Sequence, residues 1–291
     1  MPLGSPSNTR IGIQPSAVAA RFAAGAALLA LASCGGGPLS SSVSGPPARR
    51  APSGSKHGRR AAPRPVLPAG LITHGPRTRR WVALTFDADM TRGMLAELHS
   101  GRVGGWYDAA LFDELRATHT QATIFLTGLW TQAYPGIART LARSPQFELE
   151  NHSLDHAGWV SPCYGLPTVS GEPSKRSEIG DARSIIERVT GVVPRYFRFP
   201  GGCENDADLR LVERFGERAV GWDVVSGDAF QPSAGPIIRA VLSGVRPGSI
   251  VIAHCIGAPN APATALAMRT IIPSLRARGY RLVTVARLLN G

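Results

Sequence analysis

Seven short runs of apolar and β-branched residues alternate with longer segments in which apolar residues recur every three or four positions. Short runs of this kind predict strands, and the longer spacing predicts helices. The predicted strands are 81–89, 122–126, 147–151, 196–198, 219–222, 249–253 and 280–283, and the predicted helices are 108–117, 134–142, 177–190, 206–215, 235–245 and 261–278. Strands that alternate with helices indicate one α/β domain with a parallel sheet, either open or closed into a barrel.

The first predicted strand, WVALTFDAD at 81–89, ends in a pair of acidic residues. Asp87 is the first acidic residue in the chain, and Asp89 follows two positions later. A lone Asp-x-Asp is more often a turn after a strand than a site. In α/β folds, however, the ends of parallel strands carry the chemistry. The pair is therefore a candidate site if other polar clusters meet it.

Other polar clusters do follow the predicted strands. They are HSLDH from His152 to His156, Arg198 with FPGG, Trp222-Asp223 with Asp228, and His254. Two histidines four residues apart on one side of a helical turn suit a divalent metal, and a carboxylate completes a three-ligand site with open positions. Taken singly, each cluster has a structural explanation: Arg198 can pair with a surface acid, and His254 can be a core histidine.

Five motifs, TFDAD, NHSLDH, FRFPGG, GWDVVSGD and IVIAH, occur in this order between residues 81 and 289. In this respect the chain resembles the polysaccharide deacetylases, the carbohydrate esterases of family four built on the NodB-homology domain. The resemblance implies an α/β fold, a distorted seven-stranded (β/α) barrel. It also implies metal-dependent removal of acetyl groups from an N- or O-acetylated polysaccharide of the cell wall or an exopolysaccharide.

The resemblance further implies that His152 and His156 bind a divalent metal. Zinc is the first expectation, with cobalt, nickel and manganese as alternatives. The family's usual TFDDG places a ligand Asp where this chain has Ala88. Asp89 replaces that ligand through a small backbone shift, or the metal is held by two histidines and water, or the metal is lost. The adjacent acid favours Asp89 as the third ligand.

The catalytic roles come from the same resemblance. Asp87 matches the family's general base, and His254 matches its general acid. Arg198 is expected to keep Asp87 ionised and oriented, and Asp228 is expected to do the same for protonated His254. A backbone N–H near Gly201 is expected to help the metal stabilise the oxyanion.

The lining of the expected pocket departs from the family pattern. The Trp of the family's DxxDW motif is Ala229 here, so that wall of the acetyl pocket is missing unless Trp222 or Phe230 supplies it. The loop 93–107, with its Trp-Tyr pair, is expected to form part of the glycan cleft. Two other functions remain open: hydrolysis of another amide or ester, and a non-catalytic, carbohydrate-binding lipoprotein on the same fold.

The cysteines suggest one disulfide. Cys163 and Cys203 lie on loops after successive strands, so an oxidising compartment would favour their pairing. Cys255, at a strand end beside His254, is expected to be a small buried apolar residue.

Charge is unevenly distributed along the chain. Of its 32 Lys and Arg residues, eleven lie in residues 1–80, which contain none of the 20 acids, so residues 81–291 are nearly neutral. The hydrophobic content of 43% is that of a globular protein. A neutral domain with a basic tail argues against nucleic acid as a partner and fits a tail near an anionic surface. An unconstrained linker encoded by a high-GC genome explains the arginines equally well. No oligomeric state is indicated.

Residues 1–33 predict a bacterial lipoprotein signal peptide. Arg10 and Arg21 precede the apolar run 22–31, which is too short to span a bilayer as a helix. The following LASC resembles a lipobox, so Cys34 would carry the lipid that anchors an extracytoplasmic protein to the membrane; an ordinary signal peptide is the alternative.

Residues 34–80 predict a disordered tether, because twenty of the 36 residues from 35 to 70 are Gly, Pro or Ser. Residues 81–291 form the predicted deacetylase domain.

Overall fold

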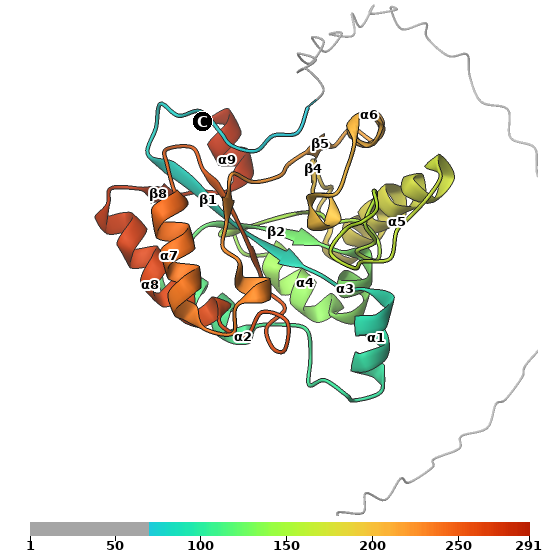
Figure 1. The fold of residues 1–291 in the computed structure, drawn as a ribbon, viewed down its shortest axis with the longest axis horizontal. Helices are drawn as coiled ribbons and strands as arrows, with labels where there is room; N and C mark the ends of the chain where they lie inside the picture. Colours follow the sequence, from blue (N-terminus) through green and yellow to red (C-terminus); the bar gives the residue numbers. More distant parts are fainter. Residues whose placement is uncertain (1–69) are drawn as a thin grey trace, which may run out of the picture. The chain divides into compact units, whose positions relative to one another are not determined.

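The computed structural model describes residues 70–291 (Figure 1). The predicted signal peptide, Cys34 and most of the predicted tether lie outside these residues. Among the helices within 70–291, none combines the length and the apolar character needed to cross a membrane.

The described residues form a curled parallel sheet with helices packed on it. Seven strands lie in the order β5-β4-β3-β2-β1-β7-β6, and β8 pairs with the first two residues of β1. The strands are β1 Trp81–Ala88, β2 Ala122–Leu126, β3 Phe147–Asn151, β4 Tyr196–Phe197, β5 Arg218–Ala219, β6 Val224–Val225, β7 Ile250–His254 and β8 Arg281–Leu282. All the pairings between named strands are parallel, and the expected distorted seven-stranded barrel is confirmed.

The six predicted helices are present, with ends shifted by a few residues. The helices are α1 Arg92–His99, α2 Ala109–Ala117, α3 Gly128–Ala133, α4 Pro135–Ala142, α5 Glu172–Thr190, α6 Asp206–Arg214, α7 Ala234–Gly244, α8 Thr264–Ala277 and α9 Val285–Asn290, and two 3-10 turns, η1 Pro200–Gly202 and η2 Asp228–Phe230, follow strands. The sequence pattern misses α1, α3, α9 and β6. Elements of two to eight residues are too short to show a clear period.

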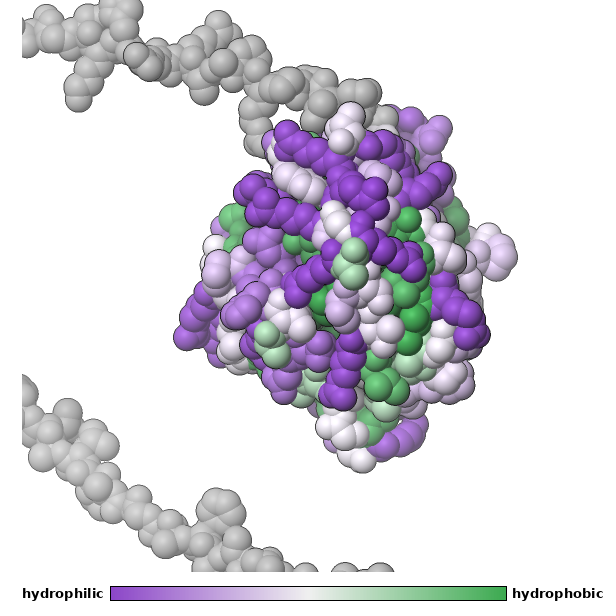
Figure 2. All heavy atoms as spheres, turned by 90° about the vertical axis from the view of Figure 1, so that its left-hand side faces the viewer, coloured by the Kyte–Doolittle hydropathy of each residue, from purple (hydrophilic) through white to green (hydrophobic). Residues whose placement is uncertain are grey.

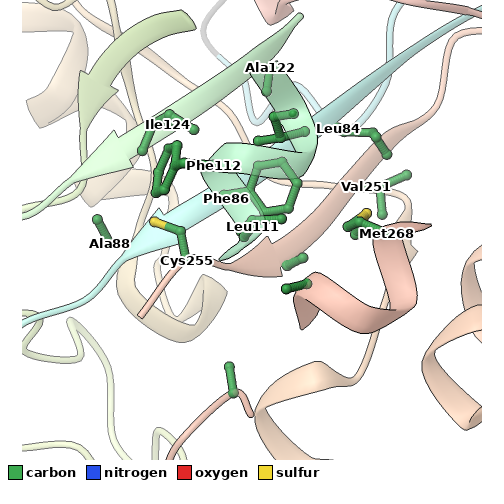
Figure 3. Close-up of a cluster of buried hydrophobic side chains, with 14 of the residues drawn as sticks. Leu84, Phe86, Ala88, Leu111, Phe112, Ala122, Ile124, Val251, Cys255 and Met268 are labelled. Atoms are coloured by element: carbon green, nitrogen blue, oxygen red, sulfur yellow. The ribbon is translucent and has the colours of Figure 1, made fainter. Parts of the chain in front are cut away.

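The two faces of β1 have different surroundings. Leu84, Phe86 and Ala88 point toward the helices and pack with Leu111 and Phe112 of α2 in the main hydrophobic core (Figure 3). All five side chains are buried. The outer side of the helical layer is solvated: Figure 2 shows the side that carries α7 and α8, where hydrophilic residues predominate around a narrow hydrophobic band. The other face of β1 is directed to the interior of the curled sheet.

A segment before β1 pairs with the end of the edge strand β5 and with the residues that precede β7. Within the described residues β5 and β6 do not pair with each other, although they are consecutive in the chain. The backbone N–H of Ile72 donates to Ala219 O at 3.0 Å, and Gly221 N donates to Ile72 O at 2.9 Å. Gly75 N donates to Gly248 O at 2.8 Å. The predicted tether of 34–80 is therefore too long, because residues from Ile72 onward belong to the folded domain.

We expect a fragment that begins at residue 81 to be less stable than one that begins at residue 70. The shorter fragment loses these backbone hydrogen bonds and the packing of Ile72, which together contribute about 2 kcal/mol to the free energy of unfolding. Urea denaturation of the two fragments measures the difference. Ile72→Ala in the longer fragment should reproduce part of it, whereas equal stabilities would show that the segment contributes nothing.

Candidate active site

The pleat of β1 places Asp87 and Asp89 on the interior side of the curled sheet. Successive side chains of a strand point to opposite faces, so both acids lie opposite Ala88, which is buried in the hydrophobic core. Asp87 is 2% exposed and Asp89 7%. Asp87 pairs in register with His254 of β7. Asp89 thus reaches the interior by the ordinary alternation of the chain.

Asp89 meets two histidines from the end of β3. Its Oδ1 lies 3.3 Å from Nε2 of His152 and 3.4 Å from Nε2 of His156. One ligand atom from each of the three residues falls within 4.8 Å of the other two. The structure therefore brings together the three residues that the sequence suggests as metal ligands.

The HSLDH segment is an irregular loop. Ser153 and His156 have φ values of 70° and 58°, in the left-handed region. The expectation that one helical turn presents both imidazoles is therefore wrong. Ser153 N donates to the side chain of Asn151, and Glu178 of α5 accepts the backbone N–H groups of Leu154 and Asp155. These bonds, not helical spacing, make the two imidazoles converge.

The donor set fits a divalent cation. The Nδ1 of His152 lies 2.8 Å from the carbonyl oxygen of Arg198, which can only accept, so Nδ1 carries the proton and Nε2 presents a lone pair. Neither that Nε2 nor Oδ1 of Asp89 has a hydrogen-bond partner, although both atoms are buried. Two lone-pair atoms that face each other call for a positive charge between them, which either a metal ion or a proton on Nε2 can supply. Burial lowers the pKa of His156 to about 4 against the opposing effect of Asp89, so this imidazole is also neutral at pH 7.

Arg198 binds Asp87 inside the sheet. Its Nη1 donates to Asp87 Oδ1 at 2.7 Å and to the hydroxyl of Thr85 at 2.8 Å, while other guanidinium atoms donate to the carbonyl oxygens of Val220 and Gly221. The guanidinium is fully buried and lies 3.9 Å from the centroid of the Phe125 ring. Pairing with a surface acid is therefore excluded, and the carboxylate of Asp87 is held in one orientation.

His254 forms a second ion pair with Asp228. Nδ1 of the imidazole lies 2.8 Å from Asp228 Oδ1, and Nε2 lies 3.7 Å from Asp89 Oδ2. The hydroxyls of Ser226 and Thr264 donate to the carboxylate of Asp228. Burial alone would lower the pKa of His254, but the carboxylates of Asp228 and Asp89 outweigh this effect and raise it to about 10. The imidazolium in turn lowers the pKa of Asp228 despite the burial of that carboxyl.

The sequence model of the polysaccharide deacetylase family matches residues 74–220, about half of the chain. The chain belongs to this family. Two relatives agree with the match. A peptidoglycan-N-acetylglucosamine deacetylase of Bacillus cereus is 27% identical over 228 residues, covering 77% of this chain and 95% of the relative. A chitooligosaccharide deacetylase of Azorhizobium caulinodans is 30% identical over 184 residues, covering 60% of this chain and 83% of the relative.

Solved structures share the fold of this polysaccharide deacetylase family member. A family 4 acetyl xylan esterase from Clostridium thermocellum, in complex with a cobalt ion, has a TM-score of 0.56 at 28% identity and covers 72% of this chain and 89% of its own. A family 4 pseudoenzyme from Bacillus anthracis has a TM-score of 0.63 at 22% identity, with coverages of 77% and 70%. The second likeness supports the fold alone.

The deacetylase domain has a cavity of about 250 Å³ above these side chains. Its polar side chains are those of Asp87, Asp89, His156, Ser226, Asp228 and His254, and its large apolar side chains are those of Tyr164, Leu166, Trp222, Val225, Phe230 and Ile252. Both aromatic residues named as substitutes for the missing Trp line the cavity, but Phe230 is exposed at its rim whereas Trp222 is half-buried, so Trp222 is the residue placed to supply that wall. The loop 93–107 does not line it: 92–99 is helix α1, and Trp106 is buried and donates from its indole N–H to Met94 O.

The cysteine predictions are confirmed. Cys163 and Cys203 form a disulfide, and Cys255 is a buried free cysteine. The disulfide joins the loop after the HSLDH segment to the end of η1, so it connects two of the loops that surround the cavity.

Sequence reasoning missed the residues that support the site. Ser226 and Thr264 hold Asp228, and Glu178 holds the HSLDH loop. Glu178 lies beside Ile179 on the buried side of α5. An acidic residue next to the apolar face of a predicted helix could have indicated from the sequence that Glu178 has a buried partner. Asp223 lies outside the site, because its carboxylate accepts from Ile250 N and from Arg77.

We expect Asp228→Asn to lower the pKa of His254. Loss of a negative charge beside the imidazolium disfavours the protonated form, so the pKa should fall from about 10 by roughly 2 pH units. NMR titration of the imidazole in chelator-treated protein measures the change. Asp223→Asn, in an acid that does not contact His254, is the matched control. An unchanged titration in Asp228→Asn would show that Asp228 does not hold the proton on His254.

Proposed function

We propose that this protein is a metal-dependent hydrolase that removes acetyl groups from an N- or O-acetylated polysaccharide. The observation that carries the proposal is the buried pair formed by His152 Nε2 and Asp89 Oδ1, which lie 3.3 Å apart and lack hydrogen-bond partners. The names of the relatives favour N-acetylglucosamine units in a cell-wall or chitin-like glycan. Similarity to the acetyl xylan esterase supports O-acetyl groups as the alternative substrate.

Asp89, His152 and His156 would hold the metal. Two imidazoles and one carboxylate suit zinc, and cobalt, nickel and manganese remain alternatives. A divalent ion bound there would supply Lewis acidity, which polarises the acetyl carbonyl and makes water easier to deprotonate near neutral pH.

Asp87 acts as the general base in this proposal. Its carboxylate lies beside the metal ligands, with Oδ2 at 3.5 Å from His152 Nε2, while Oδ1 is held by Arg198. One oxygen is thus fixed by the guanidinium, and the other faces the site, where it accepts the proton of the attacking water. Arg198 is a positioning residue, because it touches the base and does not face the reacting atoms.

His254 acts as the general acid. With a pKa raised to about 10, the imidazole is protonated at neutral pH and can donate from Nε2. Its Nδ1–H is held by Asp228 at 2.8 Å, which fixes the ring. As the bond between the acyl carbon and the sugar nitrogen or oxygen breaks, His254 protonates the leaving atom. Gly201, which lines the cavity, offers a backbone N–H for the oxyanion.

We expect Asp87→Asn and Asp89→Ala to fail in different ways. Asp87→Asn should retain metal and lose acetate release by about a hundredfold or more, because it removes the proton acceptor. Asp89→Ala should lose metal as well, because it removes an anionic ligand. Metal content and acetate release from chitin oligomers, peptidoglycan and acetylated xylan, with and without chelator, measure both effects.

Asp223→Asn is the control for these variants, since Asp223 lies outside the site. Unchanged metal affinity in Asp89→Ala would move the ligand assignment to another residue. A wild-type protein that binds metal but releases no acetate would favour hydrolysis of another amide or ester. A wild-type protein with neither property would favour a non-catalytic carbohydrate-binding protein.

We also propose that the protein is exported and anchored to a bacterial membrane through a lipid on Cys34. The basic start, the apolar run 22–31 and the LASC sequence support this proposal. The Gly, Pro and Ser-rich residues after Cys34 would tether the domain and let it reach glycans of the wall.

We expect Cys34→Ser to move the full chain from the membrane fraction to the soluble extract of a bacterial host. Labelling with an alkynyl fatty acid should mark the wild type and not the variant, because the Cys34 thiol is the group that would carry the lipid. Cys255→Ser, which changes the buried free cysteine, is the control and should keep the label. Equal labelling of all three proteins would rule out Cys34 as the lipidated residue.

A further inference from the structure

Three of the six large hydrophobic side chains that are exposed within residues 70–291 line the active-site cavity. They are Tyr164, Val225 and Phe230. Tyr164 and Phe230 are 75% and 69% exposed as whole residues, and the centroids of their rings lie 6.0 Å apart at an interplanar angle of 39°. Apolar surface that gathers at the rim of one cavity marks a binding surface.

The position of Tyr164 is fixed by its loop. The residue follows Cys163, whose disulfide with Cys203 joins this loop to the end of η1. A Cβ at Gly201 would lie 2.8 Å from Cys163 Sγ and 3.1 Å from Cδ2 of Tyr164. Only glycine at position 201 leaves room for the disulfide and the tyrosine ring. Tyr164 also has a φ of 47°, which costs about 1–2 kcal/mol in a non-glycine residue. The loop therefore holds the backbone of Tyr164 beside the cavity against a local preference.

Phe230 is fixed from the other side. It ends η2, which begins at Asp228, the residue that binds His254. Its backbone N–H donates to Gly227 O at 2.9 Å. The backbone of Phe230 is thus fixed two residues from the partner of the proposed general acid, and its side chain lines the same cavity as Asp228 and His254.

We propose that Tyr164 and Phe230 form an aromatic platform for a pyranose unit adjacent to the one that loses its acetyl group. This inference rests on the proposed function. Both residues lie outside the five sequence motifs. The acids and His254 line the buried part of the cavity, while the two rings are its most exposed lining. A sugar whose acetyl group reaches the buried part leaves its neighbour in the chain at the rim.

The chemistry of the platform suits a sugar. A pyranose has an apolar C–H face that packs on aromatic rings, and its hydroxyls stay in water at the edge. The three carboxylates that line the cavity, Asp87, Asp89 and Asp228, would repel a phosphate backbone. A neutral glycan chain is therefore the occupant that the surface favours.

The test compares an oligomer with a small ester in the metal-loaded full chain. Tyr164→Ala and Phe230→Ala should each lower kcat/KM for chitohexaose about tenfold, mainly through KM, and should change hydrolysis of 4-nitrophenyl acetate less than twofold. Tyr164→Phe should retain wild-type activity, because the ring and not the hydroxyl forms the platform. Leu266→Ala is the matched control, since Leu266 is 57% exposed on α8 and does not line this cavity.

Binding of chitohexaose to the same proteins is measured by calorimetry. This measurement distinguishes failure of the proposed deacetylase activity from failure of the proposed platform. A wild type that binds the hexamer without releasing acetate would overturn the proposed function, whereas weaker binding by the two alanine variants would still support the platform. The platform is overturned if both variants match the wild type with the hexamer, or if both substrates lose activity equally. A wild type that does not bind the hexamer also overturns it.

Discussion

Charge compensation inside the curled sheet is the constraint on which the site depends. Asp87, Asp89 and Asp228 are all buried, and an uncompensated buried charge costs several kcal/mol. Arg198 lies 2.7 Å from Asp87, and protonated His254 lies 2.8 Å from Asp228. Each of these two carboxylates has its own fixed cation. Asp89 has no cation of its own: its Oδ2 lies 3.7 Å from His254, whose charge is already paired with Asp228, and its Oδ1, which faces His152 and His156, still requires positive charge.

A proton and a divalent ion compete to supply that charge. Burial alone would lower the pKa of His152, but Asp87 and Asp89 outweigh this effect and raise it, so without metal this imidazole tends to take up a proton. The carbonyl oxygen of Arg198 holds Nδ1 of the same ring, so the added proton sits on Nε2, the atom that would bind the metal. Arg198 therefore serves both halves of the site: its guanidinium orients the proposed base, and its carbonyl selects the tautomer of a proposed ligand.

The sequence predicted the meeting of distant residues better than their local geometry. Alternation along β1 requires residues 87 and 89 to share one face, and parallel strands bring His152 and His254 to the same end of the sheet. The shape of the HSLDH loop was not predictable, because the left-handed residues in it depend on bonds from Asn151 and Glu178. The segment at Ile72 was missed for a related reason: its polar, Pro-containing surroundings resemble a linker, and its structure comes from pairing with residues far away in the sequence, at the end of β5 and before β7.

Fold similarity does not decide whether the protein is an enzyme, since a pseudoenzyme shares this fold. The side chains provide the argument. A binding protein has no need for a buried guanidinium that fixes one carboxylate, or for an imidazolium held by a carboxylate with two hydroxyl donors of its own. Each of these arrangements buries charge at a cost in stability, and each fixes a group that would move a proton in the proposed mechanism. Loss of catalysis would remove the advantage of keeping them. Their joint presence, beside an unpartnered imidazole nitrogen and carboxylate oxygen, is what favours hydrolysis over binding alone.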